Sequence, residues 1–152
     1  AAITTYSTTY SRLPTSVAPA TGDATFGLSS DPEFTSLTIY DNSDLMIILG
    51  NVNSGVNLNS AKNPQRINFL PPIKPGATTS SPGLGPDGIY RDPWGQPYII
   101  ILDLDADDQC AGLYYPTVRA AVAIWSKGPD GKFDRLSGAT VGVNQDNVLS
   151  WK

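Results

Sequence analysis

At its centre the chain reads Tyr90-Arg91-Asp92-Pro93-Trp94-Gly95-Gln96-Pro97-Tyr98 and runs directly into Ile99-Ile100-Ile101-Leu102-Asp103-Leu104. Two prolines and a glycine within nine residues exclude a helix and predict a tight turn. The apolar residues that follow fall on both faces of an extended chain. Residues 98–104 are therefore predicted to form a central or covered strand, with Trp94 covering the end of the sheet.

Two later segments are predicted to join this strand. Residues 118–125 are rich in Val, Ala, Ile and Trp and follow after a connection of about a dozen residues, which suits an antiparallel partner. Residues 148–151 can add a third strand. Because the helical patterns come first, we predict an α+β fold with a small, about three-stranded antiparallel sheet.

The N-terminal segment has a helical pattern. Ile3, Tyr6, Tyr10 and Leu13 share one face of a helix, and Pro14 should stop it. We interpret residues 1–13 as the last turns of a helix whose earlier part is missing. The start at Ala1 suggests a truncated or processed form of a longer protein.

The region between this helix and the central turn is rich in loop-forming residues. Residues 14–31 and 73–88 should be loops, and the amides of residues 51–63 should satisfy loop backbone locally. A short helix is plausible from Asp31 through Leu37. A better one covers residues 45–49, capped by Ser43 or Asp44, with Gly50 as a left-handed end.

The composition bounds the function. The length of 152 residues suits a single domain, and we divide it into residues 1–13, 14–91 and 92–152. A net charge of −4 with dispersed basic residues argues against nucleic-acid binding. The chain has no histidine and only one cysteine, Cys110, so the usual general base, zinc ligand and disulfide are all excluded. No apolar run approaches the ~18 residues of a membrane-spanning helix.

One acidic cluster could carry chemistry, namely Asp103, Asp105, Asp107 and Asp108. A carboxylate pair can do the acid–base work of glycosidases, but four carboxylates in one turn favour a solvated or cation-binding loop. The spacing departs from an EF-hand, because Asp108 and Tyr114 stand where glycine and glutamate are needed.

A second candidate cation site begins at Lys127-Gly128-Pro129-Asp130-Gly131-Lys132. The turn can aim backbone carbonyls and one carboxylate at a common point, and a carboxylate from Asn144-Gln145-Asp146-Asn147 could complete an oxygen cage. The simpler interpretation is a plain hairpin turn with an Asx residue.

The ordered pattern of residues 92–98, residues 125–132, an Asp/Asn cluster and Trp151 resembles the major, G-type pseudopilins of type II secretion systems. That family shows a DPWGNPY-like turn, a Ser-x-Gly-x-Asp-Gly strand end and an Asp-rich segment before a C-terminal Trp. Residues 6–14 also resemble the end of the long pilin helix.

The resemblance implies a non-enzymatic subunit anchored in the inner membrane by a missing N-terminal helix, with this domain in the periplasm. It implies a homopolymer that works with minor pseudopilins and inner-membrane secretion machinery to export folded proteins. It also implies one structural Ca²⁺, bound by Asp130, by the carbonyls of Lys127 and Lys132, and by Asp146. Residues 144–147 replace the family's Asp-Ala-Asp, so Asn144 and Asn147 are alternative distal ligands.

Two other functions stay open. A type IV pilin of an adhesion or motility filament would share the fold, but such pilins usually close the C-terminal loop with a disulfide, which one cysteine cannot form. A secreted carbohydrate-binding domain could instead use Trp94, Trp125 or Trp151 as a stacking platform.

Overall fold

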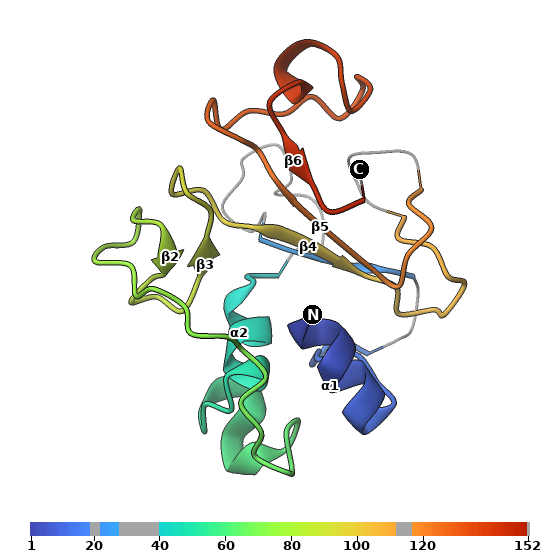
Figure 1. Cartoon of the computed structure of the whole chain (residues 1–152). Helices are drawn as coiled ribbons and strands as arrows, with labels where there is room; N and C mark the ends of the chain where they lie inside the picture. The colour runs from blue at the N-terminus through green and yellow to red at the C-terminus, as the bar shows by residue number, and fades with distance from the viewer. Residues whose placement is uncertain (19–21, 28–39, 112–116, 152) are drawn as a thin grey trace.

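A four-stranded antiparallel sheet lies at the centre of the fold, with strand order β1-β4-β5-β6. The structure, a computed structural model, describes residues 1–18, 22–27, 40–111 and 117–151. The strands are β1 (Ala24–Phe26), β4 (Ile99–Leu102), β5 (Val122–Ser126) and β6 (Val148–Leu149). The helices α1 (Ala2–Tyr10) and α2 (Ser43–Leu49) lie on one side of the sheet (Figure 1). The α+β class and the antiparallel sheet are as predicted.

Strand β4 is the centre of this sheet, as the sequence predicted. It pairs with β1 through Phe26 opposite Ile100, and with β5 through Ile99 opposite Trp125. All four of its residues are buried. Because side chains alternate along a strand, Ile100 faces the helices and Ile99 faces the opposite side.

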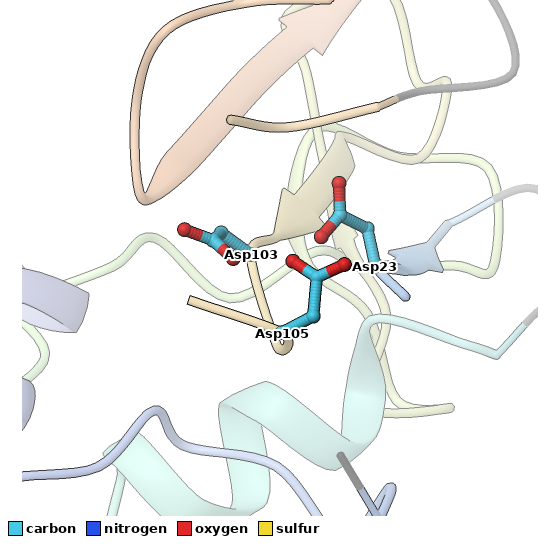
Figure 2. A group of neighbouring side chains, drawn as sticks. All are labelled: Asp23, Asp103 and Asp105. Atoms are coloured by element: carbon cyan, nitrogen blue, oxygen red, sulfur yellow. The ribbon is translucent and has the colours of Figure 1, made fainter. Parts of the chain in front are cut away.

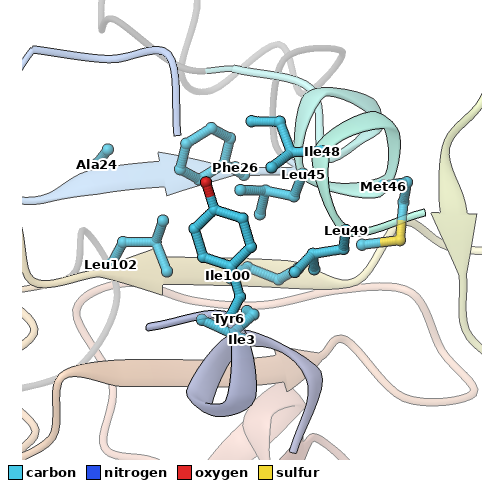
Figure 3. Packing of buried hydrophobic residues seen from close by; sticks show 10 residues of the cluster. All are labelled: Ile3, Tyr6, Ala24, Phe26, Leu45, Met46, Ile48, Leu49, Ile100 and Leu102. Carbon is cyan, nitrogen blue, oxygen red and sulfur yellow. The ribbon is translucent and has the colours of Figure 1, made fainter. Parts of the chain in front are cut away.

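The sheet therefore separates two hydrophobic clusters. The first fills the space between the sheet and the helices, as Figure 3 shows: Ile3, Tyr6, Ala24, Phe26, Leu45, Met46, Ile48, Leu49, Ile100 and Leu102. The second lies on the other face: Ile99, Ile101, Cys110, Ala123, Trp125 and Leu149. Burial on both faces explains why the strand sequence is a continuous apolar run.

The prediction of about three strands was wrong in number. Strand β1 lies within residues 14–31, which were predicted to be loop. A separate hairpin pairs β2 (Gly83–Leu84), which lies in the predicted loop 73–88, with β3 (Tyr90–Arg91), which follows that loop. Strands of two or three residues are too short to show a periodic pattern. They form here because their backbone pairs with a neighbouring strand.

The predicted strand ends were also too generous. Strand β5 begins at Val122, and Val118 forms only an isolated bridge with Cys110. Strand β6 covers Val148–Leu149 and does not continue to Trp151.

Both helices end differently from the prediction. Helix α1 ends before Pro14 because Ser11 is left-handed, with φ 52°, and its N–H donates to the Ser7 carbonyl at 2.8 Å. Helix α2 is preceded by Asn42 rather than capped by Ser43 or Asp44. Gly50 keeps a right-handed backbone with φ −81°, and Asn51 takes the left-handed position with φ 55°. The predicted helix from Asp31 to Leu37 lies outside the described residues.

Asn57 satisfies loop backbone locally, as predicted for residues 51–63, because it donates to the Val52 carbonyl and accepts from the Lys62 and Asn63 N–H groups. Buried Asn63 also joins this loop to both helices. Asn63 donates from Nδ2 to the carbonyls of Ile48 and Ile67 at 3.0 and 2.6 Å, and accepts from the Tyr10 hydroxyl at 2.7 Å. The Tyr6 hydroxyl donates to the Lys62 carbonyl. These bonds hold α1 to the loop that follows the short 3-10 helix η2 (Gly55–Ser60).

In the part of the chain that the structure describes, no helix combines the length and the apolar character needed to cross a membrane.

Candidate functional site

The Gly-Pro-Asp-Gly turn follows directly after β5. Gly128 and Gly131 both have positive φ, 68° and 65°, which glycine adopts at little cost. The Asp130 carboxylate accepts a hydrogen bond from the Lys132 N–H at 2.8 Å, which closes the turn as an Asx motif. The simpler interpretation of this segment, a turn with an Asx residue, therefore describes its local structure.

The returning chain places Asp146 against this turn. The Asp130 N–H donates to Asp146 Oδ2 at 3.2 Å. A Cβ at Gly128 would collide with the Asp146 carbonyl oxygen, so only glycine permits this approach. The two carboxylate-bearing residues that the sequence singled out are thus neighbours in space.

The other predicted ligands lie around the same turn. Lys127 is half-buried, and its Nζ lies 5.0 Å from the centre of the Phe133 ring in a cation–π contact. Lys132 and Asp130 are exposed, and Asp146 is half-buried. The lysines were predicted to act through their carbonyl oxygens, so the direction of their side chains does not bear on that role.

Asn144, an alternative distal ligand, has a different task. It is fully buried, and its Nδ2 donates to the carbonyls of Asp134, Ser137 and Gly138 at 2.9 to 3.2 Å. Its Oδ1 accepts from the Asp134 N–H at 2.9 Å. Because both ends of the amide bind the loop of residues 134–138, Asn144 shapes that loop. Asp146, the predicted distal ligand, contacts the turn through the hydrogen bond from the Asp130 N–H.

Asp92 connects the central proline-rich turn to the Gly-Pro-Asp-Gly turn. It is fully buried, and its Oδ1 accepts from the N–H groups of Trp94 and Gln96 at 3.0 and 2.9 Å. Its Oδ2 accepts from the Ser126 hydroxyl. The Ser126 oxygen in turn accepts from the Gly128 N–H at 3.0 Å. Neither Asp92 nor Ser126 was predicted to have a role of its own.

A second group of carboxylates lies at the far end of β4. Asp23, Asp103 and Asp105 are neighbours, as Figure 2 shows. Each places an oxygen within 4.8 Å of the others. Burial raises the pKa of Asp23 above its ordinary value, and the charges of Asp105 and Asp103 add to this. Such a group could hold a hard cation. Asp23 was missed because only the pairing of β1 with β4 brings it to the acidic loop.

The acidic loop is built as a turn. Asp103 is buried and accepts from the N–H groups of Ala106 and Asp108 at 2.7 and 3.0 Å. Asp107 accepts from the Gln109 N–H at 2.9 Å. Asp103 and Asp107 thus accept hydrogen bonds from the backbone of their own loop. This arrangement suits a structural loop better than a pair of catalytic carboxylates.

The three tryptophans that were named as possible stacking platforms differ in exposure, and Trp151 is half-buried against the second hydrophobic cluster. Trp125 is 1% exposed and belongs to the core, whereas Trp94 is 45% exposed. Trp94 belongs to neither hydrophobic cluster of the described residues, and its covering of the end of the sheet stays a prediction. It belongs to the turn in which Asp92 accepts hydrogen bonds from the N–H groups of Trp94 and Gln96.

Cys110 is a core residue. It is fully buried, and its Sγ donates to the Ala120 carbonyl at 3.0 Å. Burial raises the pKa of the thiol to about 11.

Comparison of the chain with protein-family models, with curated proteins and with solved structures gave no match.

Proposed function

We propose that this chain is a non-enzymatic structural subunit of a type II secretion pseudopilus, with calcium ordering the loop from Lys127 to Asn147. The observation that carries the proposal is the approach of Asp146 to the Gly-Pro-Asp-Gly turn, marked by the Asp130–Asp146 hydrogen bond of 3.2 Å. It is supported by the contact between the two motifs that carry the family resemblance, through Asp92 and Ser126.

The donor set at this turn fits a hard cation. It offers the carboxylates of Asp130 and Asp146, with the carbonyls of Lys127 and Lys132 as further oxygen ligands, and Ca²⁺ takes ligands of this type. The absence of a side chain at Gly128 lets the two chain segments come together. Calcium would supply positive charge that offsets the repulsion between the two carboxylates and links the turn to the returning chain.

In this proposal the domain lies in the periplasm, and a preceding helix anchors it in the inner membrane. Copies polymerise with one another and work with minor pseudopilins and inner-membrane secretion machinery. The protein upstream of Ala1 should then contain a Gly-Phe-Thr-x-x-Glu cleavage site followed by about 20 apolar residues, enough to cross a bilayer.

Thermal unfolding in excess Ca²⁺ and in chelator tests the calcium site. A ligand that binds only the folded state at a hundredfold excess over its Kd adds about 2.7 kcal/mol. For a chain of this size that corresponds to a rise in Tm of roughly 5–10 °C. An unchanged Tm would contradict the calcium claim.

Matched variants locate the ion. Asp130→Asn and Asp146→Asn should abolish the shift, and Asp108→Asn, an exposed aspartate at a left-handed position that Asn tolerates, should retain it. If Asp105→Asn abolishes the shift while Asp130→Asn and Asp146→Asn retain it, the ion lies in the acidic group of Figure 2 and the proposed site is wrong.

Deletion of the gene in the source organism tests the function. Folded proteins destined for export should accumulate in the periplasm, and the full-length chain should restore their export. Loss of adhesion or motility with export intact would favour the type IV pilin alternative.

A further inference from the structure

We propose that Asp92, Ser126 and Gln96 are positioning residues for the cation site, so that the central proline-rich turn supports the Gly-Pro-Asp-Gly turn. This inference rests on the calcium site proposed above. It gives the turn at residues 92–96 a role in binding the ion. The sequence of this turn does not indicate such a role, because the turn lies far from Asp130 along the chain.

The first connection runs through a buried hydroxyl. Ser126 is 1% exposed, and its oxygen both donates to Asp92 and accepts from the Gly128 N–H at 3.0 Å. Gly128 is the residue that touches the Asp146 carbonyl. The bond from Ser126 therefore fixes the first residue of the turn at the point where the returning chain meets it.

The second connection meets the other end of the turn. A Cβ placed on Gly131 would lie 3.4 Å from Cδ and Nε2 of Gln96, so the Gln96 side chain packs directly over Gly131. The backbone N–H of Gln96 also donates to Asp92 Oδ1 at 2.9 Å. One short turn thus holds the Gly-Pro-Asp-Gly turn at both of its glycines.

The burial of Asp92 makes its carboxylate depend on this support. A carboxylate removed from water needs hydrogen-bond donors, and Asp92 has three of them: the N–H groups of Trp94 and Gln96 and the Ser126 hydroxyl. Moving Ser126 away would leave the buried carboxylate with one donor fewer. The position of the Gly-Pro-Asp-Gly turn is therefore coupled to the hydrogen bonding of the buried Asp92 carboxylate.

This support bears on binding because the two proposed carboxylate ligands repel one another before a cation arrives. A turn held in place beforehand loses less conformational freedom when the ion binds, and therefore binds it more tightly. Residues that orient metal ligands without touching the metal typically change the affinity 10- to 100-fold when replaced.

Calorimetric titration of CaCl₂ into the wild type and three serine variants tests the inference. Ser126→Ala should weaken binding by about tenfold or more, and Ser126→Thr, which keeps the hydroxyl, should return the affinity to within about threefold of the wild type. Ser150→Ala is the matched control. It removes a hydroxyl that accepts from the N–H of Ile124 at 3.0 Å. Ile124 lies on β5, as Ser126 does, but this bond does not involve the turn, so the affinity should not change.

The outcomes separate the inference from the function on which it rests. A wild type that binds calcium, together with Ser126→Ala binding equally well, would overturn the positioning role and leave the proposed site standing. A wild type that binds no calcium would overturn both. The Tm of each variant in chelator measures the stability that it has lost in the absence of calcium, and titration well below that Tm separates a change in affinity from lost stability.

If Ser126→Ala does not fold, Gln96→Ala decides the question. It keeps the backbone N–H that donates a hydrogen bond to Asp92 but removes the side chain that packs over Gly131. An affinity reduced by at least about threefold supports the inference, by the same argument on residues that orient ligands. An affinity equal to that of the wild type refutes it.

Discussion

Replacement of Asn42 tests a polar connection of three hydrogen bonds between helix α2 and the central turn. Asn42 is fully buried and immediately precedes α2. Its Nδ2 donates to the carbonyls of Tyr90 and Tyr98 at 2.9 and 2.8 Å, and its Oδ1 accepts from the Tyr90 N–H at 2.8 Å. The side chain thereby joins both ends of the turn at residues 90–98 to the helix.

The expected loss of stability follows from these three bonds. A buried hydrogen bond contributes about 1 kcal/mol net, so Asn42→Ala should lower the free energy of unfolding by about 3 kcal/mol. That is a large share of the roughly 5–15 kcal/mol that stabilises a typical domain. Asn42→Asp should be at least as damaging at pH 7, because a carboxylate would face two carbonyl oxygens to which the amide now donates.

Urea unfolding followed by far-ultraviolet circular dichroism measures this loss. The midpoint should fall while the slope m stays constant, since the surface exposed on unfolding hardly changes. Asn53→Ala is the control, because Asn53 is exposed and accepts one bond, from the Asn59 N–H at 2.7 Å. If Asn42→Ala loses no more than this control, about 1 kcal/mol or less, the assigned hydrogen bonds do not hold the turn.

Two further predictions concern titratable groups. Two hydrogen bonds from Arg91 lower the pKa of Asp87 to about 2 from its ordinary 3.8, so the ionised carboxylate stabilises the fold above about pH 4 and this contribution is lost as the pH falls toward 2. Asp87→Asn should remove that part of the acid dependence in urea unfolding at pH 6 and pH 2.5, and an unchanged dependence would contradict it. Cys110, with its pKa raised to about 11, has about one thiolate per thousand molecules at pH 8 and is fully buried. Ellman's reagent should therefore label it only after unfolding in urea, and rapid labelling of the native protein would show that the site opens.

The centre of the fold could be predicted from sequence because its signals are local. A run of Ile and Leu after two prolines and a glycine indicates a buried strand wherever its partners lie. Strand β1 gives no such signal. It is three residues long, and only its pairing with β4 makes it a strand. Likewise, Gly50 and Asn51 both suit a helix end, and the sequence alone favours glycine although Asn51 takes the left-handed position.

Some residues of the candidate site could likewise be predicted from the sequence, and others could not. The sequence could suggest that Asp146 and the Gly-Pro-Asp-Gly turn lie together, because turn glycines and carboxylates are typical of an oxygen cage, and the role of these residues as calcium ligands stays a prediction. The supporting role of Asp92 could not be predicted, since nothing in a turn motif reveals that its aspartate is buried or that Ser126 lies beside it. Asp23 was hidden for a related reason, because its neighbours Asp103 and Asp105 come near only through the pairing of β1 with β4.

The strand order has a consequence for how the chain folds. Strands β4, β5 and β6 all lie between Ile99 and Leu149, whereas β1 pairs Ala24 with Leu102 across about half of the chain. Closing so long a loop costs entropy before the pairing stabilises it, which slows folding. During synthesis, β1 cannot pair until Ile99–Leu102 has left the ribosome, so the first strand to be made enters the sheet only after β4 has appeared. We therefore expect the hairpin of β4 and β5 to form first and to serve as the template on which β1 is added.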